Sequence, residues 1–125
     1  MTRCLGALAF AVVAACGSAT PRQGPATSPD VLLADEIQTT TAATAHDAVR
    51  QLRPGWLRRR GPISMRSPNA DVVVVYLDGV RLGGPESLRT IAAPSVLIIH
   101  HLNASDATTR FGTGHGGGAL LVRTN

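Results

Sequence analysis

The sequence contains no lysine, few aromatic residues and only two cysteines. All twelve basic residues are arginine, a bias that we attribute to coding composition, and aromatic residues make up 3% of the chain. The absence of lysine excludes a P-loop, which needs a lysine to reach the phosphates. The net charge of +4 permits acidic partners such as lipid phosphate but does not require them. A length of 125 residues predicts a single domain.

Residues 1–15 have the pattern of a secretory signal. A single arginine near the start is followed by the apolar stretch Leu5 to Val13, which is too short to span a bilayer as a helix. Cys16 comes directly after Ala14 and Ala15, and this ending resembles a bacterial lipobox with Val13 in place of leucine. The resemblance implies cleavage before Cys16 and lipid attachment to its sulfur. The alternative is an ordinary secretory signal that happens to contain Cys16.

Lipidation of Cys16 would leave the mature protein without a disulfide, because Cys4 lies in the removed segment. Residues 16–29 are rich in Gly, Ser, Thr and Pro, a composition that predicts a flexible tether. No aspartate follows Cys16, and resemblance to lipoprotein sorting therefore favours the outer membrane. We expect a lipid anchor on the periplasmic face of the cell outer membrane. Export argues against nucleic acid as a partner.

Residues 30–125 are predicted to form an α+β domain with a small mixed β-sheet and short helices. Thr44 is a suitable N-cap for a helix over residues 45–52, and Pro54-Gly55 should end it. Asp78-Gly79 predicts a two-residue hairpin turn with positive φ at both positions. Residues 56–67 are expected to form two short extended pieces around Gly61-Pro62. Further strands are predicted at residues 31–33, 72–77, 80–82, 95–102 and 119–124, with helical turns at 35–36 and 85–89 and a short helix ending at Arg110.

The loop from Gly112 to Gly117 matches the G-x-G-x-x-G pattern of dinucleotide-binding loops. A functional fingerprint follows a strand and opens a helix, whereas this loop follows a predicted helix and precedes the last strand. We therefore interpret it as a tight turn that needs positive φ and close approach to a neighbouring chain segment. No cofactor is expected.

The remaining polar residues suggest no catalytic or metal site. His100 and His101 are adjacent in a predicted strand and should point to opposite faces, so they are poorly placed to share a metal. No Ser-His-Asp arrangement is visible. Arg58, Arg59 and Arg60 are most simply a solvated basic turn, and the functional alternative is contact with lipid phosphate or an acidic partner.

Several stretches together resemble the plug domain of TonB-dependent receptors. "DAVRQLRPG" resembles the helix end "DAL…LPG" of that family, "RRRGPISMRS" resembles its "G-x-x-I-x-I-R-G" strand, and "VVVVYLDGVRLGG" resembles "V-L-V-L-I-D-G-V-P". The closing segment resembles the helix, glycine loop and last strand of the plug. Residues matching the plug motifs, to which the resemblance gives a structural role, are Asp78, Gly79, Phe111, Gly112, Gly114, Gly117 and Gly118.

The resemblance implies a binding or interaction module linked to outer-membrane transport, not an enzyme. The sequence departs from the family at residues 100–103, where an Arg/Lys-Gly-Pro is usual, and no TonB box is evident in residues 17–29. In the family the plug fills a β-barrel, whereas this sequence ends where the barrel would begin. We therefore expect it to act with a separate outer-membrane β-barrel protein or as a small adaptor. An envelope hydrolase and a truncated receptor fragment without function are the alternatives.

Overall fold

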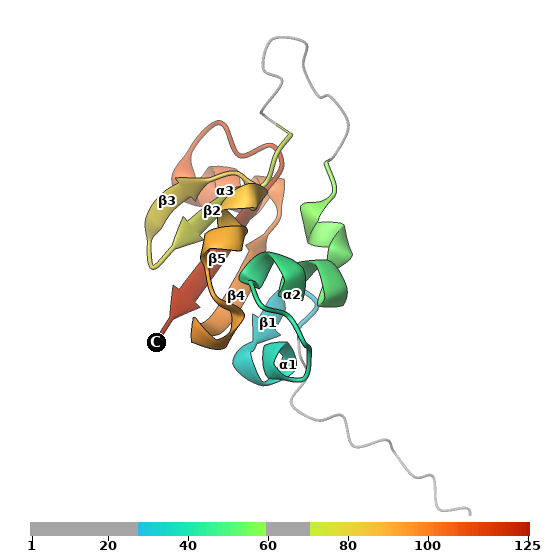
Figure 1. Ribbon diagram of the computed structural model, residues 1–125. Helices are drawn as coiled ribbons and strands as arrows, with labels where there is room; N and C mark the ends of the chain where they lie inside the picture. Colours follow the sequence, from blue (N-terminus) through green and yellow to red (C-terminus); the bar gives the residue numbers. More distant parts are fainter. Residues whose placement is uncertain (1–27, 60–70) are drawn as a thin grey trace, which may run out of the picture.

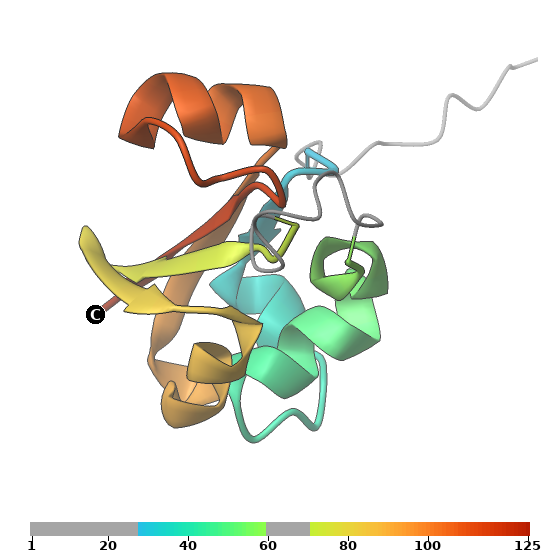
Figure 2. The same cartoon turned by 90° about the horizontal axis from the view of Figure 1, so that it is seen from above.

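In the computed structural model, a five-stranded mixed sheet is covered by helices on both faces (Figures 1 and 2). The structure describes residues 28–59 and 71–125. The sheet has the strand order β1-β4-β5-β2-β3, in which β2 and β5 run parallel and the other neighbours are antiparallel. The predicted α+β class is therefore confirmed. The strands are β1 (Val31–Leu33), β2 (Val74–Leu77), β3 (Val80–Gly83), β4 (Val96–Leu102) and β5 (Ala119–Thr124).

Three α-helices and three short 3₁₀-helices connect the strands. Figure 2 shows α3 on one face of the sheet and α1 and α2 on the opposite face. The α-helices are α1 (Ala34–Gln38), α2 (Ala45–Leu52) and α3 (Ala104–Phe111), and the 3₁₀-helices are η1 (Pro54–Leu57), η2 (Pro85–Thr90) and η3 (Ala93–Ser95).

Helix α2 has the predicted bounds and the predicted cap. The Thr44 hydroxyl accepts a hydrogen bond from the Asp47 backbone amide at 3.2 Å, which satisfies one of the free amides of the first turn. The apolar residues on one side of the helix, Ala45, Ala48 and Val49, are buried against the sheet. The amide of Ala45 also donates to the carbonyl of Ile91, which ties the start of α2 to the segment between η2 and η3.

The prediction that Trp56 and Leu57 are extended is wrong, because both lie in η1. Pro54 occupies the start of this helix, where its fixed φ favours a helical turn and its missing amide costs nothing. Trp56 then turns inward and is buried with only 8% of its surface exposed. Burial of this large side chain outweighs the extended conformation that was predicted for it. The predicted strand around Ile63 to Arg66 lies outside the described residues.

The hairpin between β2 and β3 forms as predicted. Asp78 has a φ of 48° and Gly79 a φ of 89°, so both turn positions lie in the left-handed region. Strand β2 begins at Val74, two residues later than the predicted start, and its valines are buried on both faces. Neighbouring strands β5 and β3 cover its two edges, and helices cover the two faces of the sheet.

Two hydrophobic clusters lie on opposite faces of the sheet. Alternate residues of β2 and β5 supply both clusters: Val75 and Leu120 face α2, whereas Tyr76 and Ala119 face α3. The cluster under α1 and α2 is the larger one and includes the buried side chains of Leu32, Leu88 and Ile99. The cluster under α3 consists of Val74, Tyr76, Leu102, Ala107 and Ala119, with Phe111 and Leu121 partly buried at its edge.

Candidate functional site

The glycine loop between α3 and β5 is a backbone turn packed against two other chain segments. Gly112, Gly114 and Gly118 have φ values of 88°, 93° and 87°, which L-residues with a side chain rarely adopt. A Cβ atom at Gly117 would lie 2.6 Å from the carbonyl oxygen of Asp71, and one at Gly118 would collide with the carbonyl oxygen of Leu102. The loop leads directly into β5 and opens no helix. The predicted positive φ and close approach are thus observed.

His115 is the side chain that holds this loop against the sheet. It is 3% exposed, its Nδ1 lies 2.9 Å from the carbonyl oxygen of Gly112, and its Nε2 lies 2.8 Å from the hydroxyl of Tyr76. Because a carbonyl can only accept, we assign the proton to Nδ1, and Nε2 then accepts the hydroxyl proton of Tyr76. Both ring nitrogens are therefore used within the fold.

Aromatic stacking extends the contact between Tyr76 and His115. The rings of Tyr76 and Phe111 stack with centroids 4.2 Å apart and an interplanar angle of 13°. Tyr76 and His115 are 39 positions apart in the sequence. Local spacing contains no signal for such a pair.

The adjacent histidines of β4 do not form a metal site. His101 stacks on Trp56 with ring centroids 5.2 Å apart, and its Nδ1 lies 3.4 Å from the Asp30 carboxylate. His100 is the neighbouring strand residue and faces the other side of the sheet, as predicted. Within residues 28–59 and 71–125, no three His, Cys, Asp or Glu side chains are grouped in a way that could hold a metal ion.

Asp78 has a role beyond the turn that the sequence predicted for it. Its carboxylate accepts the hydroxyl proton of Thr124 at 2.7 Å and the backbone amide of Thr124 at 3.0 Å. These two hydrogen bonds, helped by the charge of Arg123, lower the pKa of Asp78 below its usual value of 3.8. The hairpin is thereby joined to the last residues of β5.

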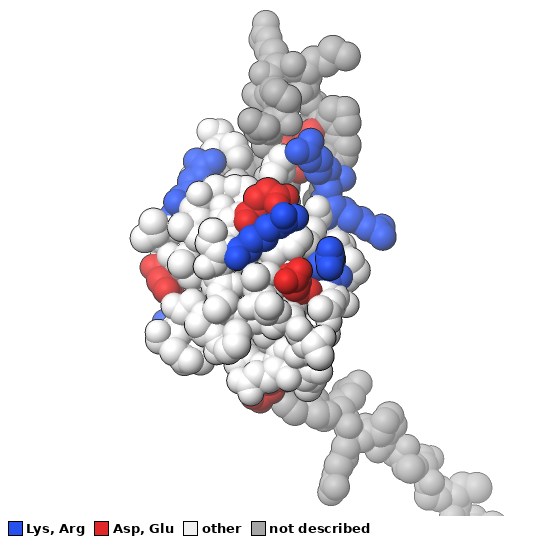
Figure 3. Space-filling view, in the orientation of Figure 1, with Lys and Arg blue, Asp and Glu red and all other residues white. Residues whose placement is uncertain are grey.

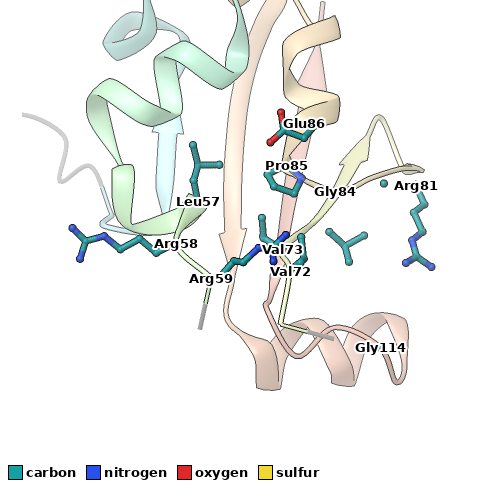
Figure 4. A pocket seen from close by; sticks show the side chains of 12 residues that line it. Leu57, Arg58, Arg59, Val72, Val73, Arg81, Gly84, Pro85, Glu86 and Gly114 are labelled. Atoms are coloured by element: carbon teal, nitrogen blue, oxygen red, sulfur yellow. The ribbon is translucent and has the colours of Figure 1, made fainter. Parts of the chain in front are cut away.

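Arginine residues line a cleft with a volume of about 500 Å³. Arg58 and Arg59 follow η1, and Arg81 belongs to β3, so residues far apart in the sequence line the same space (Figure 4). Arg58 and Arg59 belong to the arginine run noted in the sequence, whereas Arg81 was not predicted to lie with them. Arg60, predicted with them, lies outside the described residues. We call this space the arginine cleft.

Apolar side chains form part of the wall of the arginine cleft. Leu57, Val72, Val73 and Pro85 line it together with the backbone of the glycines at the end of β3. Figure 4 shows Arg59 reaching over Val72 and Val73, with Arg81 on the far side of these valines. The volume of the cleft falls within the range of small-molecule sites.

The arginines of the cleft have no acidic partner within the described ranges. The ion pairs that arginines form there join Arg50 to Asp47, Arg53 to Glu36 and Arg89 to Glu86, the last at 3.1 Å. Glu86 also lines the cleft, but its carboxylate forms an ion pair with Arg89. Figure 3 shows carboxylates interleaved with arginines over the viewed face and blue side chains gathering toward the upper right. The cleft therefore presents an excess of positive charge.

Comparisons with protein families, with curated proteins and with solved structures give no match for this chain. Among the described residues, every helix is too short or too polar to span a bilayer.

Proposed function

We propose that this protein is a lipid-anchored outer-membrane protein whose periplasmic domain is a plug-like interaction module that contacts a separate β-barrel protein. The signal and the lipobox at Cys16 support the location. The order of hairpin, strand, helix, glycine loop and closing strand agrees with the resemblance to TonB-dependent receptor plugs. A contact in trans would suit a transport-associated role without catalysis.

The observation that carries the interaction role is the exposed outer edge of β3. This strand pairs with β2 on one side only and lies at the end of the described sheet. Val80 is 64% exposed and Leu82 is 41% exposed on the same strand. An edge with unpaired backbone groups and apolar side chains is suited to receive another strand or an apolar protein surface.

The polar residues that could suggest an enzyme form hydrogen bonds or stacking contacts with other residues of the domain. His115 bonds to Tyr76 and Gly112, Asp78 bonds to Thr124, and His101 stacks on Trp56. Within the described ranges, no serine side chain bonds to a histidine; the Ser95 hydroxyl, for example, donates to the carbonyl of Ala92. These contacts favour an interaction role over the hydrolase alternative.

Lipidation is tested by substituting each cysteine in turn. We expect Cys16→Ser to abolish labelling with a radioactive fatty acid and to release the protein from the outer-membrane fraction. Cys4→Ser is the matched control and should leave the lipid in place, since Cys4 is removed with the signal. Labelling that survives Cys16→Ser would contradict the proposed anchor.

The interaction is tested by capture of the tagged protein from detergent-extracted outer membranes, followed by quantitative mass spectrometry. We expect a β-barrel protein in near-stoichiometric amount, lost in the variant Leu82→Arg. Leu97→Arg is the control, because Leu97 is 44% exposed but lies on β4, separated from β3 by β5 and β2. Equal loss in both variants, or no barrel protein in any capture, would overturn the proposal.

A further inference from the structure

The arginine cleft has no role in the proposed contact with a β-barrel protein. It lies between η1, the start of β2 and the segment that joins β3 to η2. We propose that the cleft binds a phosphoryl group carried by a small organic molecule. The inference rests on the cleft itself and is independent of lipidation at Cys16.

Charge is the first argument for an anionic ligand. Arg58, Arg59 and Arg81 are exposed and form no ion pair within the part of the chain that the structure describes, while Glu86 is engaged by Arg89. A guanidinium group donates two parallel hydrogen bonds to the oxygens of a phosphate or carboxylate. Figure 4 shows the Arg58 side chain directed away from the cleft, which leaves Arg59 and Arg81 as the two groups that would attract an anion there.

The number and placement of the arginines favour phosphate over a single carboxylate. Arg59 and Arg81 approach from opposite sides of Val72 and Val73 (Figure 4). A phosphate monoester carries close to two negative charges and three terminal oxygens, so it can accept from both arginines at once. A carboxylate has one charge and two oxygens, which one guanidinium can saturate.

The apolar wall favours an organic phosphate over the inorganic ion. Leu57, Val73 and Pro85 offer hydrocarbon contact beside the charged groups. Gly84 adds no side chain to this wall. A Cβ atom at that position would lie 3.7 Å from Val72 Cγ1. A ligand with an apolar part next to its phosphoryl group therefore matches both surfaces of the cleft. A free phosphate monoester and a lipid that ends in a phosphate monoester, such as phosphatidic acid, both have this chemistry.

Titration of the full chain in a neutral maltoside detergent tests the site with phenyl phosphate as the probe. Trp56 is the only tryptophan, and it lies in η1 next to Leu57, so its fluorescence should report binding alongside calorimetry. We expect Arg59→Gln and Arg81→Gln each to raise the dissociation constant roughly tenfold, because each removes a charge-assisted bond. Arg50→Gln changes the net charge equally, but it lies on α2 outside the cleft and should leave the constant unchanged.

The outcomes separate the proposal from unspecific charge attraction. Phenyl phosphate should bind more tightly than benzoate, and unchanged thermal midpoints would show that the variants are folded. Tighter binding of short-chain phosphatidic acid than of phenyl phosphate would identify a lipid headgroup as the source, and weaker binding would identify a free phosphate monoester. Equal affinity for benzoate, equal loss in Arg50→Gln, or no binding of phenyl phosphate would overturn the assignment.

Discussion

The two faces of the sheet differ in what holds their helices in place. On the α1–α2 face, side chains such as Leu32, Leu88 and Leu120 are fully buried in one large cluster. On the α3 face, the smaller cluster is supplemented by the Tyr76–His115 hydrogen bond, by stacked rings and by glycines pressed against carbonyl groups. Hydrophobic burial stabilises in proportion to area, whereas hydrogen bonds and close backbone contacts depend on geometry. The α3 face should therefore be more sensitive to small changes of shape.

The largest loss of stability is expected on the α3 face, at the glycine loop. Gly118→Ala forces a side chain into positive φ and against the Leu102 carbonyl, so we expect a loss of at least about 3 kcal/mol in the free energy of unfolding. Gly55→Ala is the control, because nothing lies within 4 Å of a Cβ atom there. Chemical denaturation measures both variants. A similar, small effect in both would show that the loop can shift freely.

The next largest loss of stability is expected in β5, where the neighbouring residues Leu120 and Leu121 point to opposite faces of the sheet. Leu120→Ala should destabilise the protein by about 3 kcal/mol, since Leu120 is fully buried in the large cluster. Leu121→Ala should cost about 1 kcal/mol, because Leu121 is only partly buried beside α3. The loss in each variant is measured from the midpoint of denaturant unfolding, provided that the slope of the transition is unchanged. Equal losses would contradict the difference between the two faces.

A smaller effect is expected from the hydrogen bond on the α3 face. Tyr76→Phe removes the hydroxyl that His115 Nε2 accepts from and should cost about 1 kcal/mol, while keeping the ring stacked on Phe111. Thr90→Ala is the control: its hydroxyl donates to the Ser87 carbonyl at the exposed surface, and its loss should cost less. Thermal unfolding in parallel checks both. A larger loss at Thr90 would show that the buried pair contributes little.

The smallest effect concerns pH and the hairpin. Because hydrogen bonds from Thr124 lower the pKa of Asp78, its contribution to stability is present above pH 3.8 and is lost as the pH falls through the lowered value. The thermal midpoint of wild type should therefore exceed that of Thr124→Val at neutral pH, and the difference should narrow in acid. A difference that stays constant from pH 7 to pH 2 would contradict the assignment.

Local patterns predicted most of the elements of this fold. Thr44 and the spacing of Ala45, Ala48 and Val49 gave α2 its bounds, and Asp78-Gly79 predicted the turn, because capping and turn conformations depend on residues close in sequence. Trp56 was placed wrongly because its position depends on burial beside His101, which is distant in sequence. Tertiary packing there overrides the local pattern.

The candidate sites were less predictable than the elements. Arg58 and Arg59 stood out as part of a charge run, but their partner Arg81 comes from another strand. The Tyr76–His115 pair was missed for the same reason. Both depend on the order of strands in the sheet, and residue spacing along the chain contains no direct signal for that order.

The most direct test of the interaction role is site-specific photo-crosslinking in intact outer membranes. A photoreactive amino acid would replace Leu82 on the exposed edge of β3 or, in a second strain, the equally exposed Leu97 on β4. We predict a crosslink from position 82 to one β-barrel protein and none from position 97. No crosslink at position 82, or the same products from both positions, would contradict the proposed contact.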